Sequence, residues 1–134
     1  MSPESLRNAG ILLVLVTAVE FGGVSLLYFI QSRTPGYLDN QVRQNLFRAG
    51  HAHAGVLVIL ALVGLLYVDA TGYGDGTKQL VRIALSAAPI LMPAGFFFSV
   101  ASPRAERPNA LIWLTYLGGL SLAVGVVTLG LGLL

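Results

Sequence analysis

Glu20, His51 and His53 are the side chains within or beside the long apolar stretches whose chemistry could serve a function. The two histidines stand in the segment RAGHAHAG, directly before an apolar run that continues to Val68. A neutral imidazole is the commonest metal ligand in proteins, and ionisable groups inside a membrane are rare and mark functional sites. We therefore expect at least one histidine to bind a metal or a cofactor.

The spacing of the histidines limits how they can act together. On a regular helix, side chains two residues apart point about 200° away from each other. Both His51 and His53 can bind one metal only if the helix is unwound there; otherwise one is the ligand and the other faces elsewhere. His53 is the favoured ligand, because Ala54 and Gly55 beside it leave room for a flat cofactor. His51, nearer the headgroups, could also simply hydrogen-bond to lipid or to a loop.

Glu20 lies ten residues past Gly10, which is a depth of about 15 Å at 1.5 Å per residue. An ionised carboxylate near the middle of a bilayer costs at least ~2.5 kcal/mol. Glu20 must therefore be protonated, paired or exposed to water. It is either a neutral group hydrogen-bonded to a neighbour such as Thr17, or a catalytic residue.

Two arginines lie at the membrane edge from which the histidine segment begins. Arg43 and Arg48 could each pair with acidic groups of a cofactor beside His53. Alternatively, they extend their guanidinium groups to lipid phosphates, as basic side chains near span ends commonly do.

The elements that carry these residues follow from the composition. The 134-residue chain is 55% hydrophobic and only 10% charged, which is far too little charge for a soluble domain. Its charges separate apolar runs at residues 9–30, 50–68, 80–100 and 110–134, each close to the ~20 residues that cross a bilayer as a helix. We expect one all-α membrane domain over residues 1–134, a four-transmembrane-helix bundle in a lipid bilayer.

Further features refine this expectation. Pro89 and Pro93 should bend the third span and open a space lined by Gly95 and by the phenylalanines that follow it. A stretch over residues 39–47 should lie at the membrane interface. Small residues at four-residue spacing, such as Ser121 and Gly125, favour either a homo-oligomer or close packing within one chain.

Other classes of protein are disfavoured. The chain has no cysteine, so disulfides, thiolate catalysis and iron–sulfur clusters are excluded. It has no cluster of lysines and arginines with interleaved aromatic residues, so nucleic acid is not an expected partner. Five loop arginines after spans one and three, against three basic residues at the other end, weakly favour both termini outside the cytoplasm.

Several short motifs recur in one order along most of the chain. They are GIL at the start of the first span, Phe21–Gly22, the PGY of residues 35–37, RAGHAHAG, and FS…SP over residues 98–103. In this order they resemble the styrene oxide isomerase family, small four-span membrane enzymes that bind haem b and isomerise aryl epoxides to aldehydes.

The resemblance implies that His53, in the AHAG segment, ligates the haem iron, and that the chain forms a trimer with haem near the subunit contacts. The polar residues that the family uses for substrate and catalysis fall here on Ile59, Ala88 and Phe96, which cannot supply those hydrogen bonds. Glu20 and His51 are additions to the pattern. The resemblance therefore supports haem binding by this chain more strongly than it supports the isomerase reaction.

Two functions follow as alternatives. In the first, the chain is a haem-b enzyme that isomerises a small apolar epoxide to a carbonyl, with ferric haem as Lewis acid and Glu20 as a catalytic polar group. In the second, it is a non-enzymatic haem- or copper-binding redox subunit. A third alternative is a helix bundle that moves protons or solutes by means of Glu20 and binds no cofactor. In each case we expect a multi-pass protein of a bacterial inner membrane.

Overall fold

The structure, a computed structural model, describes all 134 residues and contains helices but no strands. The helices are α1 (Pro3–Gln31), α2 (Gln41–Val68), α3 (Asp75–Ser99), the 3-10 turn η1 (Ala110–Ile112) and α4 (Trp113–Leu133). Helices α1, α2 and α3 are each long and apolar enough to cross a membrane, and so is the continuous segment Ala110–Leu133 that η1 and α4 form together. The chain is an all-α, four-helix, multi-pass membrane protein, as the sequence predicts.

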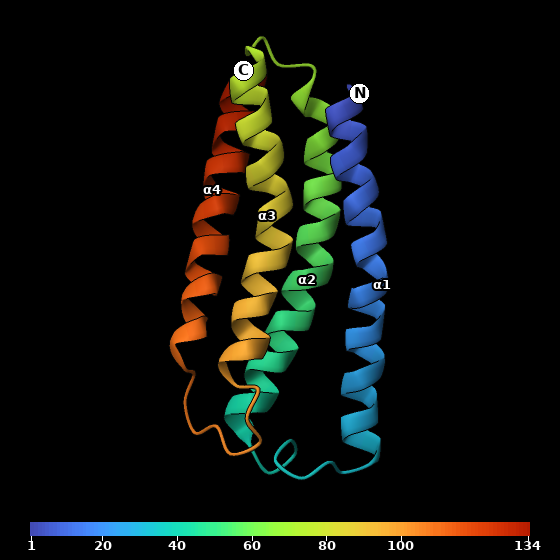
Figure 1. Ribbon diagram of the computed structural model, residues 1–134, viewed down its shortest axis with the longest axis vertical. Coiled ribbons are helices and arrows are strands. Elements are labelled where there is room, and N and C mark those ends of the chain that lie inside the picture. The colour runs from blue at the N-terminus through green and yellow to red at the C-terminus, as the bar shows by residue number, and fades with distance from the viewer.

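The helices run alternately up and down and stand side by side in the order α4, α3, α2, α1 (Figure 1). Each helix packs on its neighbours in sequence, whereas α1 and α4 do not touch. Both termini lie at one end of the bundle with the α2–α3 loop, and the other two loops lie at the opposite end. The bundle is therefore open, and most of α1 and α4 faces the surroundings.

Three helices begin earlier than the sequence suggests, and the first of them, α1, begins at Pro3 rather than Ala9. Helix α2 begins at Gln41 rather than Gly50, because the Asn40 side chain caps it by accepting a hydrogen bond from the Arg43 N–H at 3.1 Å. The expected interfacial stretch over residues 39–47 is thus mostly the first turns of α2. Helix α3 likewise begins at Asp75 rather than Leu80. Polar residues can continue a helix beyond the hydrocarbon, and hydropathy does not detect those turns.

Small residues set the close contact of α3 with α4. A side chain on Gly118 would meet the Met92 backbone at 2.6 Å, and one on Gly95 would clash with the Thr115 backbone. Ser121 donates a hydrogen bond to the α3 backbone at 2.9 Å. Gly118 and Ser121 of α4 therefore pack against α3 within the chain. Gly95 faces α4, which corrects the expectation that it lines the space beside the prolines.

Candidate functional site

The two histidines occupy different faces of α2, which is a continuous helix from Gln41 to Val68. No turn is unwound around them, so His51 and His53 of one chain do not converge on a shared metal. His51 is partly buried and faces α1, whereas His53 is exposed and lies against Phe96 of α3. No group of three histidine, aspartate or glutamate side chains is arranged to hold a metal ion.

His53 is fixed by contacts on two sides. Its Nδ1 lies 2.7 Å from the carbonyl oxygen of Ala49, one turn earlier in α2. Because a carbonyl oxygen can only accept, Nδ1 carries the proton, and the lone pair of the neutral ring is on Nε2. The ring also packs against Phe96, with centroids 5.1 Å apart and an angle of 42° between the planes. His53 is thus an oriented imidazole on the outer surface of the helix.

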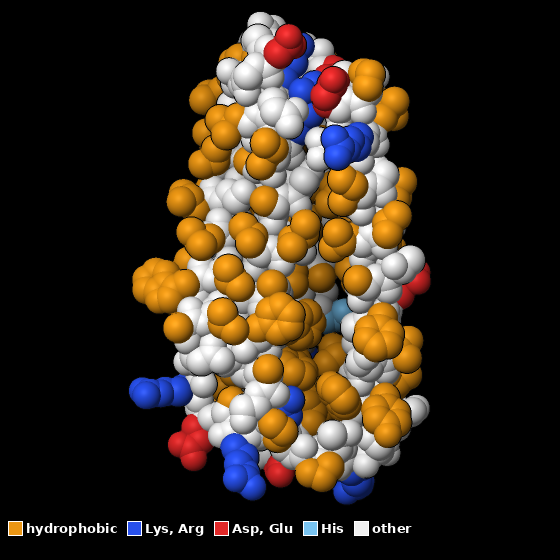
Figure 2. Space-filling view, viewed as in Figure 1, with side chains coloured by type: hydrophobic (Ala, Val, Ile, Leu, Met, Phe, Trp, Pro, Cys, Tyr) orange, Lys and Arg blue, Asp and Glu red, His pale blue; other side chains and the backbone are white.

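His51 lies in a groove between α1, α2 and α3. A side chain on Gly23 would meet the His51 ring at 3.1 Å, and one on Gly22 would meet its Nδ1 at 3.5 Å, so these glycines make room for the imidazole. The ring borders a cavity of about 240 Å³. In Figure 2, a histidine side chain is visible set back in the cleft between orange apolar side chains.

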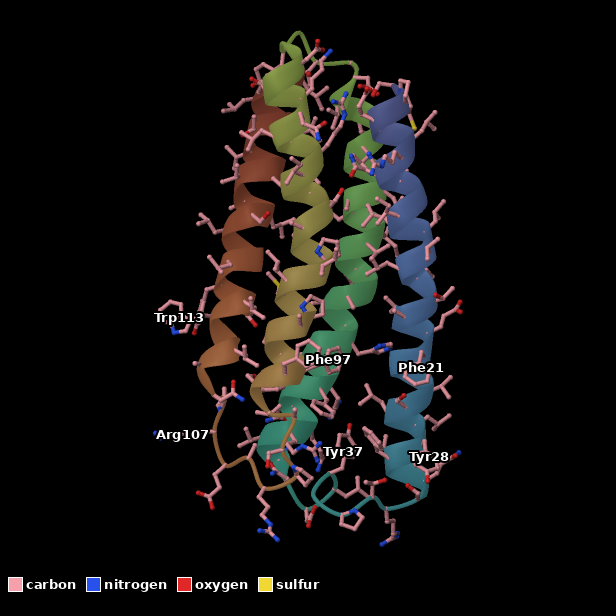
Figure 3. All side chains as sticks on the ribbon, in the orientation of Figure 1. Phe21, Tyr28, Tyr37, Phe97, Arg107 and Trp113 are labelled. Atoms are coloured by element: carbon pink, nitrogen blue, oxygen red, sulfur yellow. The ribbon has the colours of Figure 1, made fainter.

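The walls of this cavity are almost entirely apolar. Pro89, Pro93 and Phe97 form its α3 side, and Leu15, Ala18 and Val19 form its α1 side. A second apolar cavity of about 400 Å³ adjoins it toward the end of the bundle that carries the α1–α2 and α3–α4 loops. The two cavities share Gly22 and Phe97 as lining residues. Figure 3 shows Phe97 directed from α3 toward α1, with Phe21 opposite on α1.

The space expected beside the two prolines is therefore present, and Phe97 lines it as predicted. However, the histidine that borders it is His51 and not the favoured ligand His53, which borders none of the four cavities. Pro93 also leaves the Pro89 carbonyl without its usual helical donor, because proline has no N–H.

Glu20 and the arginines lie away from this groove. Glu20 is exposed on α1 and lines none of the four cavities, so it does not face the groove around His51. Arg48 is exposed and makes no hydrogen bond within the chain. Its pairing with a cofactor stays a prediction.

Arg43 has a structural role instead of the expected role beside a cofactor. Its side chain is buried and donates hydrogen bonds to the carbonyls of Val100 at 3.0 Å, Ala101 at 3.3 Å and Gly36. Its guanidinium also lies 4.9 Å from the centre of the Phe47 ring. The donors of Arg43 thus join the α1–α2 loop, at Gly36, to the start of the α3–α4 loop, at Val100 and Ala101. They are not free to pair with acidic groups of a cofactor.

Tyr37, in the α1–α2 loop, is buried next to Phe29 and Phe47. Figure 3 shows it at the end of the bundle opposite the termini. Burial raises the pKa of its phenol, and the positive charges of Arg48 and Arg43 oppose this only in part. Tyr37 therefore stays protonated and serves as packing.

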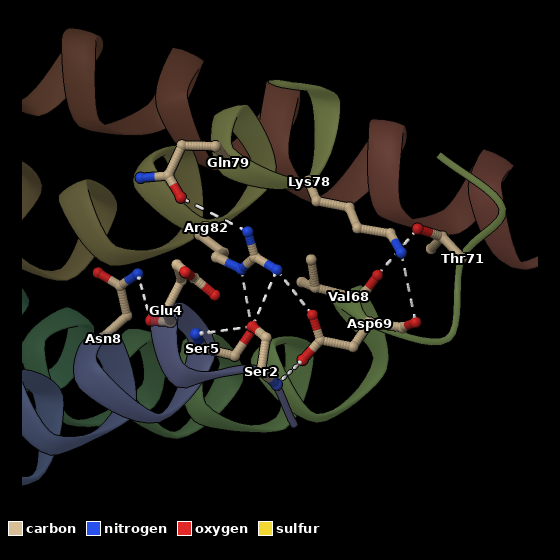
Figure 4. A network of polar contacts seen from close by, with 10 residues as sticks. All are labelled: Ser2, Glu4, Ser5, Asn8, Val68, Asp69, Thr71, Lys78, Gln79 and Arg82. Carbon is tan, nitrogen blue, oxygen red and sulfur yellow. Dashed lines mark hydrogen bonds and ion pairs between the residues drawn. The ribbon is translucent and has the colours of Figure 1, made fainter. Parts of the chain in front are cut away.

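Sequence reasoning missed a polar cluster at the other end of the bundle, drawn in Figure 4. Arg82 of α3 is buried and pairs with Asp69 at the end of α2 at 2.7 Å, and its Nε donates to the Ser5 hydroxyl at 2.9 Å. The backbone N–H of Ser2 donates to the other Asp69 oxygen at 2.6 Å. From the sequence, Arg82 and Asp69 are expected to be ordinary charged residues of the loop between the second and third spans. Nothing in their spacing indicates that three helix ends meet there.

No protein-family model, no curated protein and no solved structure matches this chain.

Proposed function

We propose that this chain is a haem-b-binding membrane protein in which His53 provides the axial ligand, located in the inner membrane of a bacterium. The observation that carries the proposal is the hydrogen bond from His53 Nδ1 to the Ala49 carbonyl at 2.7 Å. Histidines that bind metals commonly donate their other N–H to such an acceptor, which fixes the ring and makes the coordinating nitrogen more basic. Here the coordinating atom would be Nε2.

The surroundings of His53 fit a flat apolar cofactor. Ala52 and Val56 are exposed beside it on α2, and the Phe96 ring of α3 supports the imidazole from one side. One chain supplies one imidazole to such a group, since His51 faces the groove. These features support haem with a single histidine ligand over a copper site that needs several donors from one chain.

The remaining surface of the cofactor would be covered by another copy of the chain. His53 lies on an outer face, and α1 and α4 also present long exposed apolar surfaces. The resemblance to the styrene oxide isomerases implies a trimer with haem near the subunit contacts, and an outward-facing ligand agrees with that arrangement.

The reaction that the resemblance implies is isomerisation of a small apolar epoxide to a carbonyl compound. Ferric haem, when bound, supplies a Lewis acid for the epoxide oxygen. The chain would hold the cofactor through His53 and exclude water from the reacting carbon with exposed apolar side chains such as Ile59.

Glu20 is the polar group available at the right depth. It lies eleven residues before Gln31, the end of α1, and His53 lies twelve residues after Gln41, the start of α2, at the same end of the bundle. At 1.5 Å per residue both are about 17 Å from that end. Because Glu20 is exposed, we propose that it reaches the cofactor side of a neighbouring copy.

The decisive experiment is the visible absorption spectrum of the detergent-solubilised protein from haem-replete cells. We expect a Soret band that is lost in His53→Ala and kept in His51→Ala, the matched histidine on the other face. Ferric protein should then convert styrene oxide much faster than ferrous protein. Copper without porphyrin, or a Soret band that depends on both histidines, would contradict the proposal.

A further inference from the structure

The groove around His51 has no part in the proposed haem site, because it lies on a different face of α2. Its wall contains a single titratable side chain among apolar ones. His51 makes no hydrogen bond to any other residue, although its ring is held against the Gly22–Gly23 backbone. A polar ring nitrogen in an apolar surrounding is costly unless it finds a partner.

We propose that this groove binds a neutral lipophilic molecule bearing one hydrogen-bonding oxygen, such as an aryl ketone or an alcohol, with His51 as its polar contact. The neighbouring cavities of about 240 and about 400 Å³ share the walls formed by Gly22 and Phe97. Together they match the ~300–1,000 Å³ of typical small-molecule sites, which are mostly apolar with a few polar groups that fix orientation.

The chemistry of the walls selects the ligand class. Aromatic side chains, among them Phe21, Phe97 and Phe98, favour an aryl or other flat hydrocarbon portion. Neither cavity is lined by an arginine or a lysine, so nothing there would neutralise a carboxylate or a phosphate. A charged lipid headgroup is therefore disfavoured relative to a neutral oxygen.

The position of the groove indicates the route of entry. Helix α1 packs loosely on its neighbours, and few of its residues are buried in the bundle. The groove runs along the boundary between α1 and α3, where Ile90 and Phe98 are exposed to the hydrocarbon. A lipophilic molecule would thus enter sideways from the bilayer.

Benzophenone is a suitable probe, because it is an apolar diaryl ketone and attaches to nearby C–H bonds under ultraviolet light. The full chain in phosphatidylcholine nanodiscs would be illuminated with benzophenone, and the labelled residues identified by peptide mass spectrometry. We expect saturable labelling between Leu15 and Leu26 of α1 and between Pro89 and Phe98 of α3. Acetophenone should compete about three- to tenfold better than ethylbenzene, which has a similar shape but no oxygen.

Two variants separate the contributions of the polar contact and of the space. His51→Phe keeps a ring of similar size and should lower labelling about three- to tenfold. Ala18→Leu fills the groove from the exposed side of α1 and should abolish saturable labelling, whereas the matched Ala123→Leu on the exposed face of α4 should leave it unchanged.

The proposal would be overturned by labelling that is spread over the outer face of α4 or that persists in both groove variants. Equal competition by acetophenone and ethylbenzene, or stronger competition by a fatty acid, would also overturn it. None of these results depends on the Soret band, so failure of the haem proposal and failure of the groove proposal can be told apart.

Discussion

Arg82 and Asp69 form an ion pair with Nη2 and Oδ1 2.7 Å apart, and the side chain of Arg82 is only 6% exposed. The same carboxylate accepts the Ser2 N–H from the start of α1. One aspartate therefore joins the ends of three helices, α1, α2 and α3, at the end of the bundle that holds the termini (Figure 4).

We expect Asp69→Asn to destabilise the protein strongly. Loss of the carboxylate charge leaves the buried Arg82 guanidinium without its counter-ion, and breaking a buried pair in this way costs about 3 kcal/mol. Thermal unfolding in detergent, followed by circular dichroism, measures the change. Asp75→Asn is the matched control, since Asp75 is exposed and makes no side-chain hydrogen bond, and it should shift the transition little.

The same pair should make stability depend on pH in the acid range. Burial alone raises the pKa of Asp69, but hydrogen bonds from the Ser2 backbone and from Arg82 outweigh it and hold the pKa well below its usual range. The stabilisation is complete above the unfolded value of about 4 and is lost as the pH falls below it toward the folded pKa. Between about pH 5 and about pH 2, the unfolding temperature of the wild type should fall more than that of Asp69→Asn. Parallel curves would contradict this assignment.

The contact of α3 with α4 predicts opposite effects for one substitution at two glycines. Gly118→Ala should cost about 1–3 kcal/mol, because the added carbon would meet the Met92 backbone at 2.6 Å. Gly130→Ala meets nothing within 4 Å and should be neutral or stabilising by up to about 1 kcal/mol, since alanine favours the helix. Unfolding temperatures of the two variants test this; equal effects would mean that α4 packs elsewhere.

Arg43 and Arg48 should differ when each is replaced by lysine. Arg43→Lys keeps the charge but loses the forked donors that reach three carbonyls, so we expect a loss of at least about 2 kcal/mol. Arg48→Lys changes an exposed side chain without hydrogen bonds and should stay within about 0.5 kcal/mol. Unfolding in detergent gives the stabilities, and the Soret absorbance per chain should fall only in the Arg48 variant if Arg48 pairs with cofactor acids.

Glu20→Gln tests the proposed catalytic role. Glutamine keeps the size of the side chain and removes its acid, so fold and Soret absorbance should be unchanged, whereas turnover of styrene oxide should fall by about 100-fold or more. Glu4→Gln, in the exposed first turn of α1, is the control. Unchanged turnover in Glu20→Gln would leave Glu20 as a lipid-facing or interface residue.

The arrangement of α1 explains why part of the candidate site could be predicted and part could not. Spacing alone predicts that His51 and His53 take different faces of a helix. Which face meets α1 could not be predicted, because lipid-facing and helix-facing sides are both apolar and hydropathy does not distinguish them. The choice depends on Gly22 and Gly23, whose lack of side chains lets α1 approach the His51 ring.

The amino-acid sequence by itself determined the four membrane spans, because only a run of about 20 apolar residues can cross the hydrocarbon as a helix with its backbone hydrogen bonds satisfied. Tertiary structure alone decided that Arg43 binds loop carbonyls, that Gly95 faces α4, and that Asp69 and Arg82 meet. These contacts join residues far apart in the chain. They depend on how the helices approach one another, and local residue patterns do not encode that.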